Sequence, residues 1–192
     1  MNLINALFAV RSDEVTIPCV VESLDRPLGV LAAKSAFSAQ PSTGVGSPRI
    51  FLFSGNLVMS IVPVGAARVL LELAESTTPT RSIKAEVHFP VRASLAETEL
   101  FERVLFEAGT TCGGCHHEEK AVDEAPSRHR FESGVLRPRP QEEVPISFLQ
   151  AEARACNRDL EAERCEMLSA LFDHGAVEER HFSPEARTIY GD

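Results

Sequence analysis

The stretch from Arg49 to Val62 reads Arg-Ile-Phe-Leu-Phe-Ser-Gly-Asn-Leu-Val-Met-Ser-Ile-Val and has the clearest β-strand pattern in the chain. Its first five residues predict an apolar strand, and the Ser-Gly-Asn at 54–56 is a turn signal. Residues 57–62 predict a second strand that returns along the first. We therefore expect an antiparallel hairpin at this point.

Two further strands are expected after this hairpin, over residues 69–74 and 82–90. In the second of them, Lys84, Glu86 and His88 alternate with apolar residues and so share the polar face of the strand. We interpret His88 as a solvated residue of that face. Short strands separated by turns at near-regular spacing predict an antiparallel meander within a β-rich module over residues 1–92.

One more strand is expected before the meander. Residues 15–21 read Val-Thr-Ile-Pro-Cys-Val-Val, which is rich in β-branched side chains. Pro18 interrupts this run and cannot donate a backbone hydrogen bond to a neighbouring strand, so the pattern suits a strand at the edge of a sheet.

The hydrophobic period changes from two to three or four residues at Ser94, which predicts an amphipathic helix over about residues 95–108. Ser94 and Glu97 have the spacing of a capping box at its start, and Gly109 suits its end. Two more helices are expected near the carboxyl terminus, over residues 146–155 and 160–172. The fold class predicted is therefore α+β, with the β module followed by a helical module over residues 93–192.

The sequence Cys112-Gly113-Gly114-Cys115-His116 follows the first of these helices and has the pattern C-x-x-C-H. This is the attachment pattern for covalent haem, in which the two thiols bond to the vinyl groups of the porphyrin. The histidine that follows would be the first axial ligand of the iron. The motif predicts one haem c in the chain, attached through Cys112 and Cys115 and ligated by His116.

Residues 95–117, a helix running into C-x-x-C-H, resemble the amino-terminal helix and haem site of class I c-type cytochromes. The Leu-Phe and Gly-Thr pairs at 105–106 and 109–110 also resemble the segment before the motif in di-haem cytochrome peroxidases. The resemblance implies a helical cytochrome c-like module and an electron carrier rather than an enzyme. A peroxidase of that family would need two haem motifs, and this chain contains only a single C-x-x-C-H.

Other chemistries remain open for the same residues. Zinc could be held by Cys112, Cys115, one of His116 or His117, and a fourth ligand. A thiol redox pair of the thioredoxin type would stand at the start of a helix after a strand, whereas this motif follows a predicted helix. The rival function is a structural or interaction protein, not an enzyme, in which the motif binds zinc or forms a local disulfide.

The second axial ligand of the haem iron is not fixed by the sequence. Met167 lies in the last predicted helix, where a Met and His pair would suit electron transfer, but it also fits the apolar stripe of that helix. His129 lies in a polar loop that could fold back over the haem. The iron could also have no second protein ligand.

Composition limits the partners. The 192-residue chain carries a net charge of −9 and has a pI of about 5.2, which argues against nucleic acid as the main partner. An acidic surface could dock a basic redox partner. No run of 18 apolar residues occurs, so no membrane-spanning helix is expected. The oligomeric state stays open.

Covalent haem attachment implies a periplasmic or extracellular location, although residues 1–10 lack the positive charges expected before a signal-peptide core. A bridge between Cys156 and Cys165 would fit that location, but two buried thiols fit the sequence equally well. The hypothesis from the sequence is an exported c-type haem protein that transfers single electrons to a redox partner or senses redox state.

Overall fold

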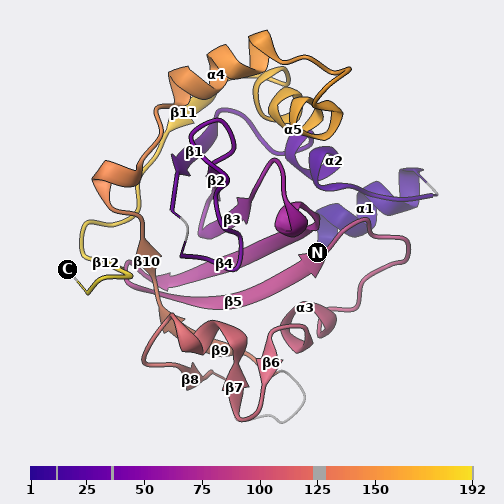
Figure 1. Cartoon of the computed structure of the whole chain (residues 1–192). Helices are drawn as coiled ribbons and strands as arrows, with labels where there is room; N and C mark the ends of the chain where they lie inside the picture. The colour runs from indigo at the N-terminus through magenta and orange to yellow at the C-terminus, as the bar shows by residue number, and fades with distance from the viewer. Residues whose placement is uncertain (12, 36, 123–128, 192) are drawn as a thin grey trace.

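The computed structural model describes residues 1–11, 13–35, 37–122 and 129–191. Within them, a mixed eight-stranded sheet has the strand order β11-β1-β2-β3-β4-β5-β9-β8 (Figure 1). Its strands are β1 (Leu28–Ala33), β2 (Arg49–Ser54), β3 (Leu57–Ile61), β4 (Leu70–Thr78), β5 (Arg81–His88), β8 (Lys120–Ala121), β9 (Phe131–Gly134) and β11 (Val177–Glu179). The pair β1 and β11 is parallel, and the other pairs are antiparallel.

The centre of the sheet is the meander β2-β3-β4-β5, as the sequence predicts. The hairpin between β2 and β3 closes on the pair Ser54 and Leu57, and Gly55 in its turn has φ of 57°. Glycine adopts this left-handed conformation without the steric cost that a Cβ would bring. The tight turn fixes the register, so Phe51 pairs with Ser60.

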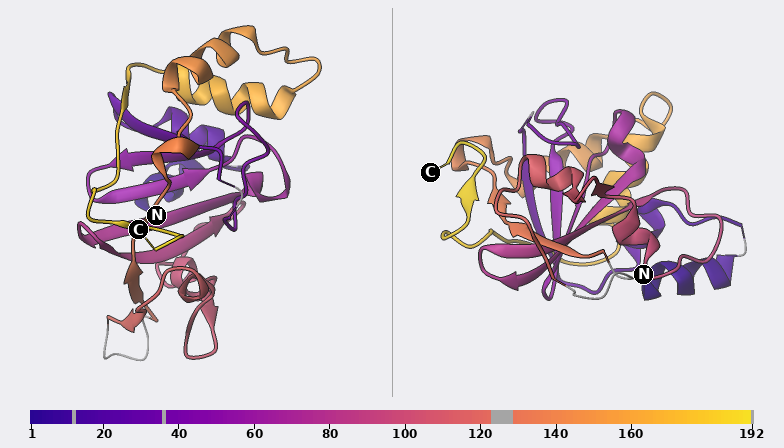
Figure 2. Two further views of the ribbon diagram at one scale, coloured as in Figure 1. Left: turned by 60° about the vertical axis from the view of Figure 1, so that its left-hand side comes forward. Right: turned by 90° about the horizontal axis from the view of Figure 1, so that it is seen from below.

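Helices cover one face of the sheet (Figures 1 and 2). The helical segments are α1 (Asn2–Arg11), α2 (Ile17–Glu22), α3 (Glu99–Glu102), α4 (Ile146–Ala155), α5 (Ala162–Phe172) and the short 3-10 turns η1 (Ala66–Val69), η2 (Thr111–Gly114) and η3 (Pro140–Glu142). The core between α2, α4, α5 and the sheet contains fully buried residues such as Ile50, Leu52, Leu149 and Leu168. Burial of such side chains from water is the main source of stability.

Among the described residues, no α-helix lies over the other face of the sheet, where the short turns η2 and η3 line a cavity. Alternate residues of β1 and β2 form a small second cluster there, in which Leu31 and Phe51 pack with Phe182 from the carboxyl-terminal segment. Two short β-ribbons stand outside the main sheet. They pair β6 (Leu105–Phe106) with β7 (Gly109–Thr110), and β10 (Leu136–Arg137) with β12 (Arg187–Thr188).

The predicted fold class is wrong, because one mixed sheet takes strands from both halves of the chain. Residues 93–192 were expected to form a helical cytochrome c-like module after an amino-terminal meander. Instead β8, β9 and β11 come from this half and join the same sheet as the meander. The two carboxyl-terminal helices do form, as α4 and α5, but they pack on the sheet and on α2. The domain boundary at residue 92 stays a prediction, although the sheet takes strands from both of its sides.

The helix expected over residues 95–108 is also wrong. Only α3 is helical, and a hairpin of β6 and β7 follows it, with Glu107 in its turn at φ of 52°. Leu100 and Val104 are buried, whereas Phe106 is 59% exposed. The apolar positions therefore do not form one continuous buried stripe. The C-x-x-C-H motif follows this hairpin and not the end of a helix.

Residues 15–21 were expected to be an edge strand, and this prediction is wrong as well. Residues 17–22 form α2, whose amino terminus is capped by the Thr16 hydroxyl, which accepts a hydrogen bond from the Cys19 backbone N–H. Pro18 lies in the first turn, where its missing N–H would have had no helical partner. Proline therefore starts a helix here.

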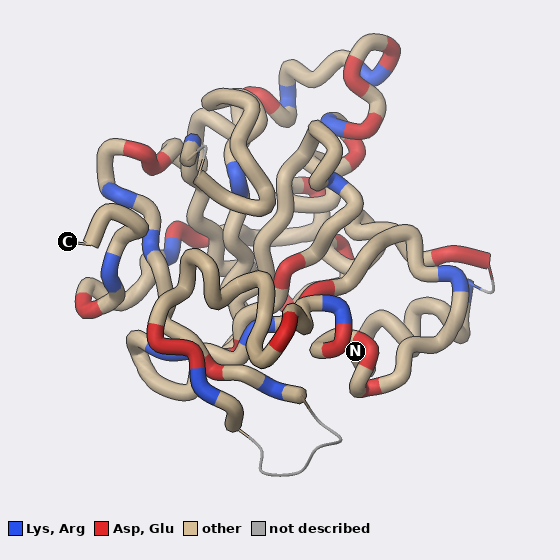
Figure 3. Tube along the Cα trace, turned by 60° about the horizontal axis from the view of Figure 1, so that its bottom comes forward, with Lys and Arg blue, Asp and Glu red and all other residues tan. Residues whose placement is uncertain are grey.

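Cys156 and Cys165 form a disulfide that joins the end of α4 to α5. Among the described residues, no helix has the length and apolar character needed to cross a membrane, which confirms that part of the expectation. Acidic and basic residues are interspersed along the trace (Figure 3). The net charge of −9 is therefore spread over the molecule.

Candidate functional site

The C-x-x-C-H motif forms part of the wall of a cavity of about 620 Å³ on the sheet face opposite the α-helices. The turn η2 holds Cys112, and the backbone N–H groups of Cys115 and His116 donate to the Cys112 carbonyl at 3.1 and 2.8 Å. This single tight turn brings both thiols and the imidazole to one wall. All three residues line the cavity.

Glu119 holds the motif turn in place. Its carboxylate accepts hydrogen bonds from the Thr110 backbone N–H, at 2.8 Å, and from the Thr110 hydroxyl. A Cβ at Gly113 would come within 2.9 Å of a Glu119 oxygen, and one at Gly109 would come closer still. The small residues on both sides of Cys112 therefore leave room for this carboxylate.

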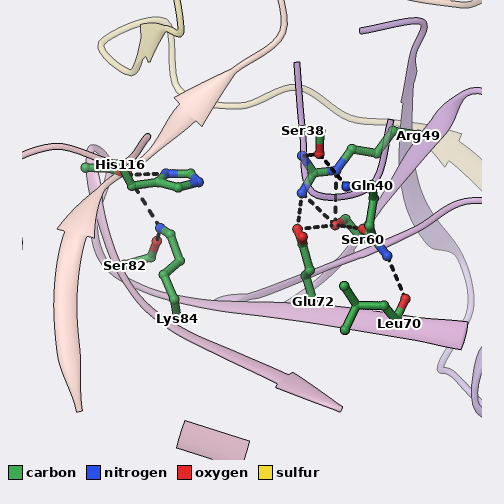
Figure 4. A network of polar contacts seen from close by, with 10 residues as sticks. Ser38, Gln40, Arg49, Ser60, Leu70, Glu72, Ser82, Lys84 and His116 are labelled. Carbon is green, nitrogen blue, oxygen red and sulfur yellow. Dashed lines mark hydrogen bonds and ion pairs between the residues drawn. The ribbon is translucent and has the colours of Figure 1, made fainter. Parts of the chain in front are cut away.

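The orientation of His116 is set by β9. Its Nδ1 lies 2.8 Å from the Gly134 carbonyl oxygen, which can only accept, so Nδ1 carries the hydrogen. The other ring nitrogen, Nε2, is directed toward the space between this wall and the sheet residues Arg49 and Glu72 (Figure 4). Burial, together with the positive charge of Lys84, lowers the pKa of His116 to about 4. The imidazole is therefore neutral near pH 7 and has its Nε2 lone pair available.

Lys84, on strand β5 of the sheet, lies next to the imidazole of His116. Its Nζ donates to the Ser82 hydroxyl and lies 3.5 Å from the carbonyl oxygen of Gly134, the group that also accepts from His116 (Figure 4). The residue is only 7% exposed, and none of the carboxylates in the described ranges is within ion-pair distance of it. Burial lowers the pKa of Lys84 to about 8, while nearby Cys112 and Glu72 oppose this shift.

A polar network stands across the cavity from His116 (Figure 4). Arg49 from β2 pairs with Glu72 from β4, and its Nε and Nη2 donate to the Ser60 hydroxyl at 3.2 and 2.9 Å. Arg49 also donates to Ser38. Ser60 donates to the side chain of Gln40 at 2.6 Å, and Gln40, which is fully buried, donates to the Leu70 carbonyl at 2.6 Å. The side chains of Arg49, Ser60 and Gln40 are therefore held in place by consecutive hydrogen bonds.

The two motif thiols are free, and they differ in exposure. Cys112 is half-buried and Cys115 is exposed. Burial raises the pKa of the Cys112 thiol above its ordinary value, although a hydrogen bond with Thr110 opposes this. A reactive redox thiol needs a lowered pKa. Cys112 therefore lacks the property expected of a thioredoxin-type nucleophile.

The structure brings together Cys112, Cys115 and His116 but neither of the two residues considered as second iron ligand. Met167 is 3% exposed in the core beneath the helices, on the opposite side of the sheet from the cavity. His129 is exposed, has φ of 43°, and does not line the cavity. His88 is exposed and contacts Glu86, in agreement with its interpretation as a solvated strand residue.

Sequence reasoning missed the sheet residues of the site. The sequence predicts that Lys84 lies on the polar face of its strand, and in the structure that face lines a cavity together with Arg49, Ser60 and Glu72. The alternation of side chains along β2 and β3 contains a signal for these residues. Arg49 and Ser60 fall on the same face once the hairpin register is fixed, because Arg49 is two residues before Phe51, the partner of Ser60. Charged residues on alternate positions of otherwise apolar central strands indicate a lined cavity.

The similarity of residues 95–117 to c-type cytochromes now rests on the C-x-x-C-H motif, since the helix expected before it is absent. Among the described residues, no group of three or more His, Cys, Asp or Glu side chains is arranged to hold a metal ion. Comparisons of the chain with protein-family models, with curated proteins and with solved structures find no match.

Proposed function

We propose that this chain is an exported single-haem c-type protein that binds haem covalently through Cys112 and Cys115 and ligates the iron through His116. The observation that carries the proposal is the placement of all three residues on the wall of one cavity. Its function would be the transfer of single electrons, or the sensing of redox state, through the haem.

The donor set fits the iron of a haem. Histidines that ligate a metal through Nε2 commonly donate Nδ1–H to a carbonyl, which fixes the ring and raises its basicity. His116 has this arrangement with Gly134, and its lowered pKa keeps the imidazole neutral. Nε2 therefore needs no proton loss before it coordinates.

The cavity fits a cofactor in size and lining. Its volume of about 620 Å³ falls within the roughly 300–1,000 Å³ that small-molecule and cofactor sites occupy. Phe51, Phe53, Val58, Val104 and Leu136 supply apolar surface, and the polar groups gather on the sheet around Arg49 and Lys84. A porphyrin has the same division between an apolar ring and charged substituents.

In this proposal the haem supplies a one-electron couple, and the chain sets its surroundings. Gly134 and β9 hold the imidazole, and Glu119 holds the turn that carries both thiols. The sheet shields the inner side of the cavity from water, which favours the less charged state of a buried group. The net charge of −9 would favour a redox partner with a basic docking surface.

The disulfide between Cys156 and Cys165 supports the exported location. Structural disulfides form and persist in oxidising compartments such as the periplasm and are rare in the reducing cytosol. The same compartments are where covalent haem attachment would occur. The alternative, a non-enzymatic protein whose motif binds zinc or forms a disulfide, is tested by the same experiment.

The experiment expresses the chain behind a signal peptide in a bacterial host that has haem-attachment machinery. Haem absorbance that stays with the polypeptide after denaturation and acid-acetone extraction is the expected result. One equivalent is expected for each chain, and Cys112→Ala with Cys115→Ala should abolish it. Cys19→Ala is the matched control, because Cys19 is a free buried cysteine on the helical side of the sheet.

The same preparation separates the rival functions. Metal analysis that finds one zinc per chain and no haem iron would contradict the proposal in favour of a zinc site. Thiol titration that finds Cys112 and Cys115 oxidised to a disulfide in haem-free, correctly exported protein would contradict it in favour of a local bridge. His116→Ala should keep the thioether bonds possible while changing the haem spectrum.

A further inference from the structure

We propose that the haem iron in this protein has no second protein ligand, and that its sixth position takes a small exogenous ligand that accepts a hydrogen bond from Arg49. The inference rests on the proposed function, because it needs haem at Cys112, Cys115 and His116. It goes further by assigning a ligand-binding role to the cavity wall that faces the Nε2 of His116.

Few kinds of side chain ligate haem iron, so the position of each candidate can be compared with the cavity. Methionine and histidine are the usual second ligands of electron-transfer haems. The three methionines lie on the helical side of the sheet, Met59 and Met167 in the core and Met1 packed against it. Among the described residues that line the cavity, none is a methionine.

Four of the other five histidines also lie away from the side of the cavity that faces the Nε2 of His116, and the fifth, His181, lines the cavity. His88 contacts Glu86, His174 lies 3.7 Å from Glu22 on the helical side, and His117 and His129 are exposed and do not line the cavity. His181 does line it, at the rim, where its side chain is 58% exposed and lies 3.6 Å from Glu143. The residues outside the described ranges include no His, Met, Lys or Cys in the sequence.

Lys84 is the other candidate within the cavity, and it lies on the wrong side. Its Nζ and the Nδ1 of His116 both approach the Gly134 carbonyl oxygen, so Lys84 stands beside the imidazole (Figure 4). A second axial ligand must approach from the opposite side of the porphyrin. Figure 4 places the pair of Arg49 and Glu72 across the cavity from the Nε2 of His116.

Arg49 can donate hydrogen bonds but cannot ligate the iron. A guanidinium keeps its proton and has no free lone pair for iron. The structure gives partners to four of its five N–H groups, on Ser38, Ser60 and Glu72, and leaves one hydrogen on Nη1 without a partner among the described residues. The side chain is 17% exposed and is held by the network that ends at Gln40. Because Arg49 lines the cavity, its guanidinium is a fixed donor at the cavity wall.

These features define the class of ligand. It has two or three atoms, binds iron through one end, and carries a lone pair with partial or full negative charge at the other end. A charge-assisted hydrogen bond from a guanidinium is stronger than one between neutral groups. Carbon monoxide tests this for the reduced protein, and cyanide or azide tests it for the oxidised protein.

The experiment uses the exported, haem-loaded chain. We expect a high-spin ferric absorption spectrum, and binding of carbon monoxide after reduction without displacement of a protein ligand. Arg49→Leu should lower the affinity for cyanide about tenfold or more, the factor that corresponds to the loss of one hydrogen bond to a charged group. The C–O stretching frequency of the reduced complex should also rise when this positive charge is removed.

Arg68→Leu is the matched control, since Arg68 is a surface residue that pairs with Glu163. If Arg49→Leu does not fold, Glu72→Gln tests the same network, because it changes the anchor of the guanidinium without removing the donor, and a shift in the C–O frequency is expected. The spin state of the unsubstituted protein stands on its own in either case.

The possible failures are distinguishable. Covalent haem with a low-spin, six-coordinate spectrum that resists carbon monoxide would overturn this inference and leave the proposed function intact. If His181→Ala converted such a spectrum to high spin, His181 would be the second ligand. Unchanged cyanide affinity and C–O frequency in Arg49→Leu would overturn the role of Arg49. Absence of covalent haem would overturn the proposed function and this inference together.

Discussion

Lys84 brings an ammonium group to a wall where water is scarce and where, among the described residues, it has no ion-pair partner. Its pKa is lowered from 10.5 to about 8, chiefly by burial. A shift of this size lowers the free energy of unfolding by on the order of 3 kcal/mol at any pH where Lys84 is charged in both the folded and the unfolded protein. Lys84 should therefore destabilise the haem-free protein at neutral pH.

The sign of the pH dependence follows from the direction of the shift. Below about pH 8 Lys84 is charged in both states, and folding carries the full cost. Between about pH 8 and 10.5 the unfolded state binds more protons than the folded state, so stability rises with pH. Lys84→Met should raise the free energy of unfolding in urea at pH 7 and give a smaller gain at pH 10.

Lys34→Met is the control for this prediction, because Lys34 is exposed. Its effect on the free energy of unfolding should be small and equal at pH 7 and pH 10. A gain from Lys84→Met that is the same at both values would show that the ammonium of Lys84 is already well solvated, or that it is neutralised by a carboxylate.

At the scale of elements, the turn that carries the motif depends on Glu119, a residue outside the C-x-x-C-H motif. The Glu119 carboxylate accepts both the N–H and the hydroxyl of Thr110. A hydrogen bond to a charged group contributes about 1.5–3 kcal/mol. Glu119→Ala should therefore speed hydrogen exchange at the Thr110 amide about tenfold or more, measured by NMR, with little change in the centre of the sheet.

Glu118→Ala is the matched control, because Glu118 is the next residue and its side chain is 69% exposed. It makes one ion pair, at 3.6 Å, with Arg81. Exposed pairs of this kind contribute about 1 kcal/mol or less, so exchange at Thr110 should be nearly unchanged. Equal effects of the two substitutions would show that the motif turn is held by charge in general and not by this carboxylate.

The elements also show how far sequence reasoning reaches. The strands β2 to β5 and the helices α4 and α5 were predictable, because each has a continuous hydrophobic period and a clear turn signal. Residues 95–108 have the helical period too, but Glu107 adopts φ of 52° and the chain turns back as a hairpin. Residues 17–22 have β-branched side chains, yet Thr16 and Pro18 start a helix. Local capping decides short segments against propensity.

At the scale of the whole molecule, the site could be predicted only in part. Cys112, Cys115 and His116 were identifiable because their spacing is local in the sequence. Gly134 and Arg49 were not, because they reach the site through strand pairing between distant segments, and β9 joins β5 although 40 or more residues separate their sequences. The parallel pairing of β11 with β1 likewise depends on the packing of α4 and α5.

The sheet has one face packed against helices and one face that lines a cavity, so filling this cavity should stabilise the molecule as a whole. We expect wild-type protein exported with the haem-attachment machinery to unfold at a higher temperature than the same protein exported without it. A group bound only by the folded state stabilises that state, and empty apolar surface forfeits packing contacts. Both samples keep the disulfide between Cys156 and Cys165, so that it does not contribute to the difference.

Cys112→Ala with Cys115→Ala provides the control, because this variant should unfold at the same temperature from either host. If haem-loaded and haem-free wild type unfold together, the haem must be attached at the motif but lie outside the cavity, in solvent. That result would separate the attachment chemistry of the motif from the binding role of the sheet face, because Arg49 and Lys84 would then face a space that the haem does not fill.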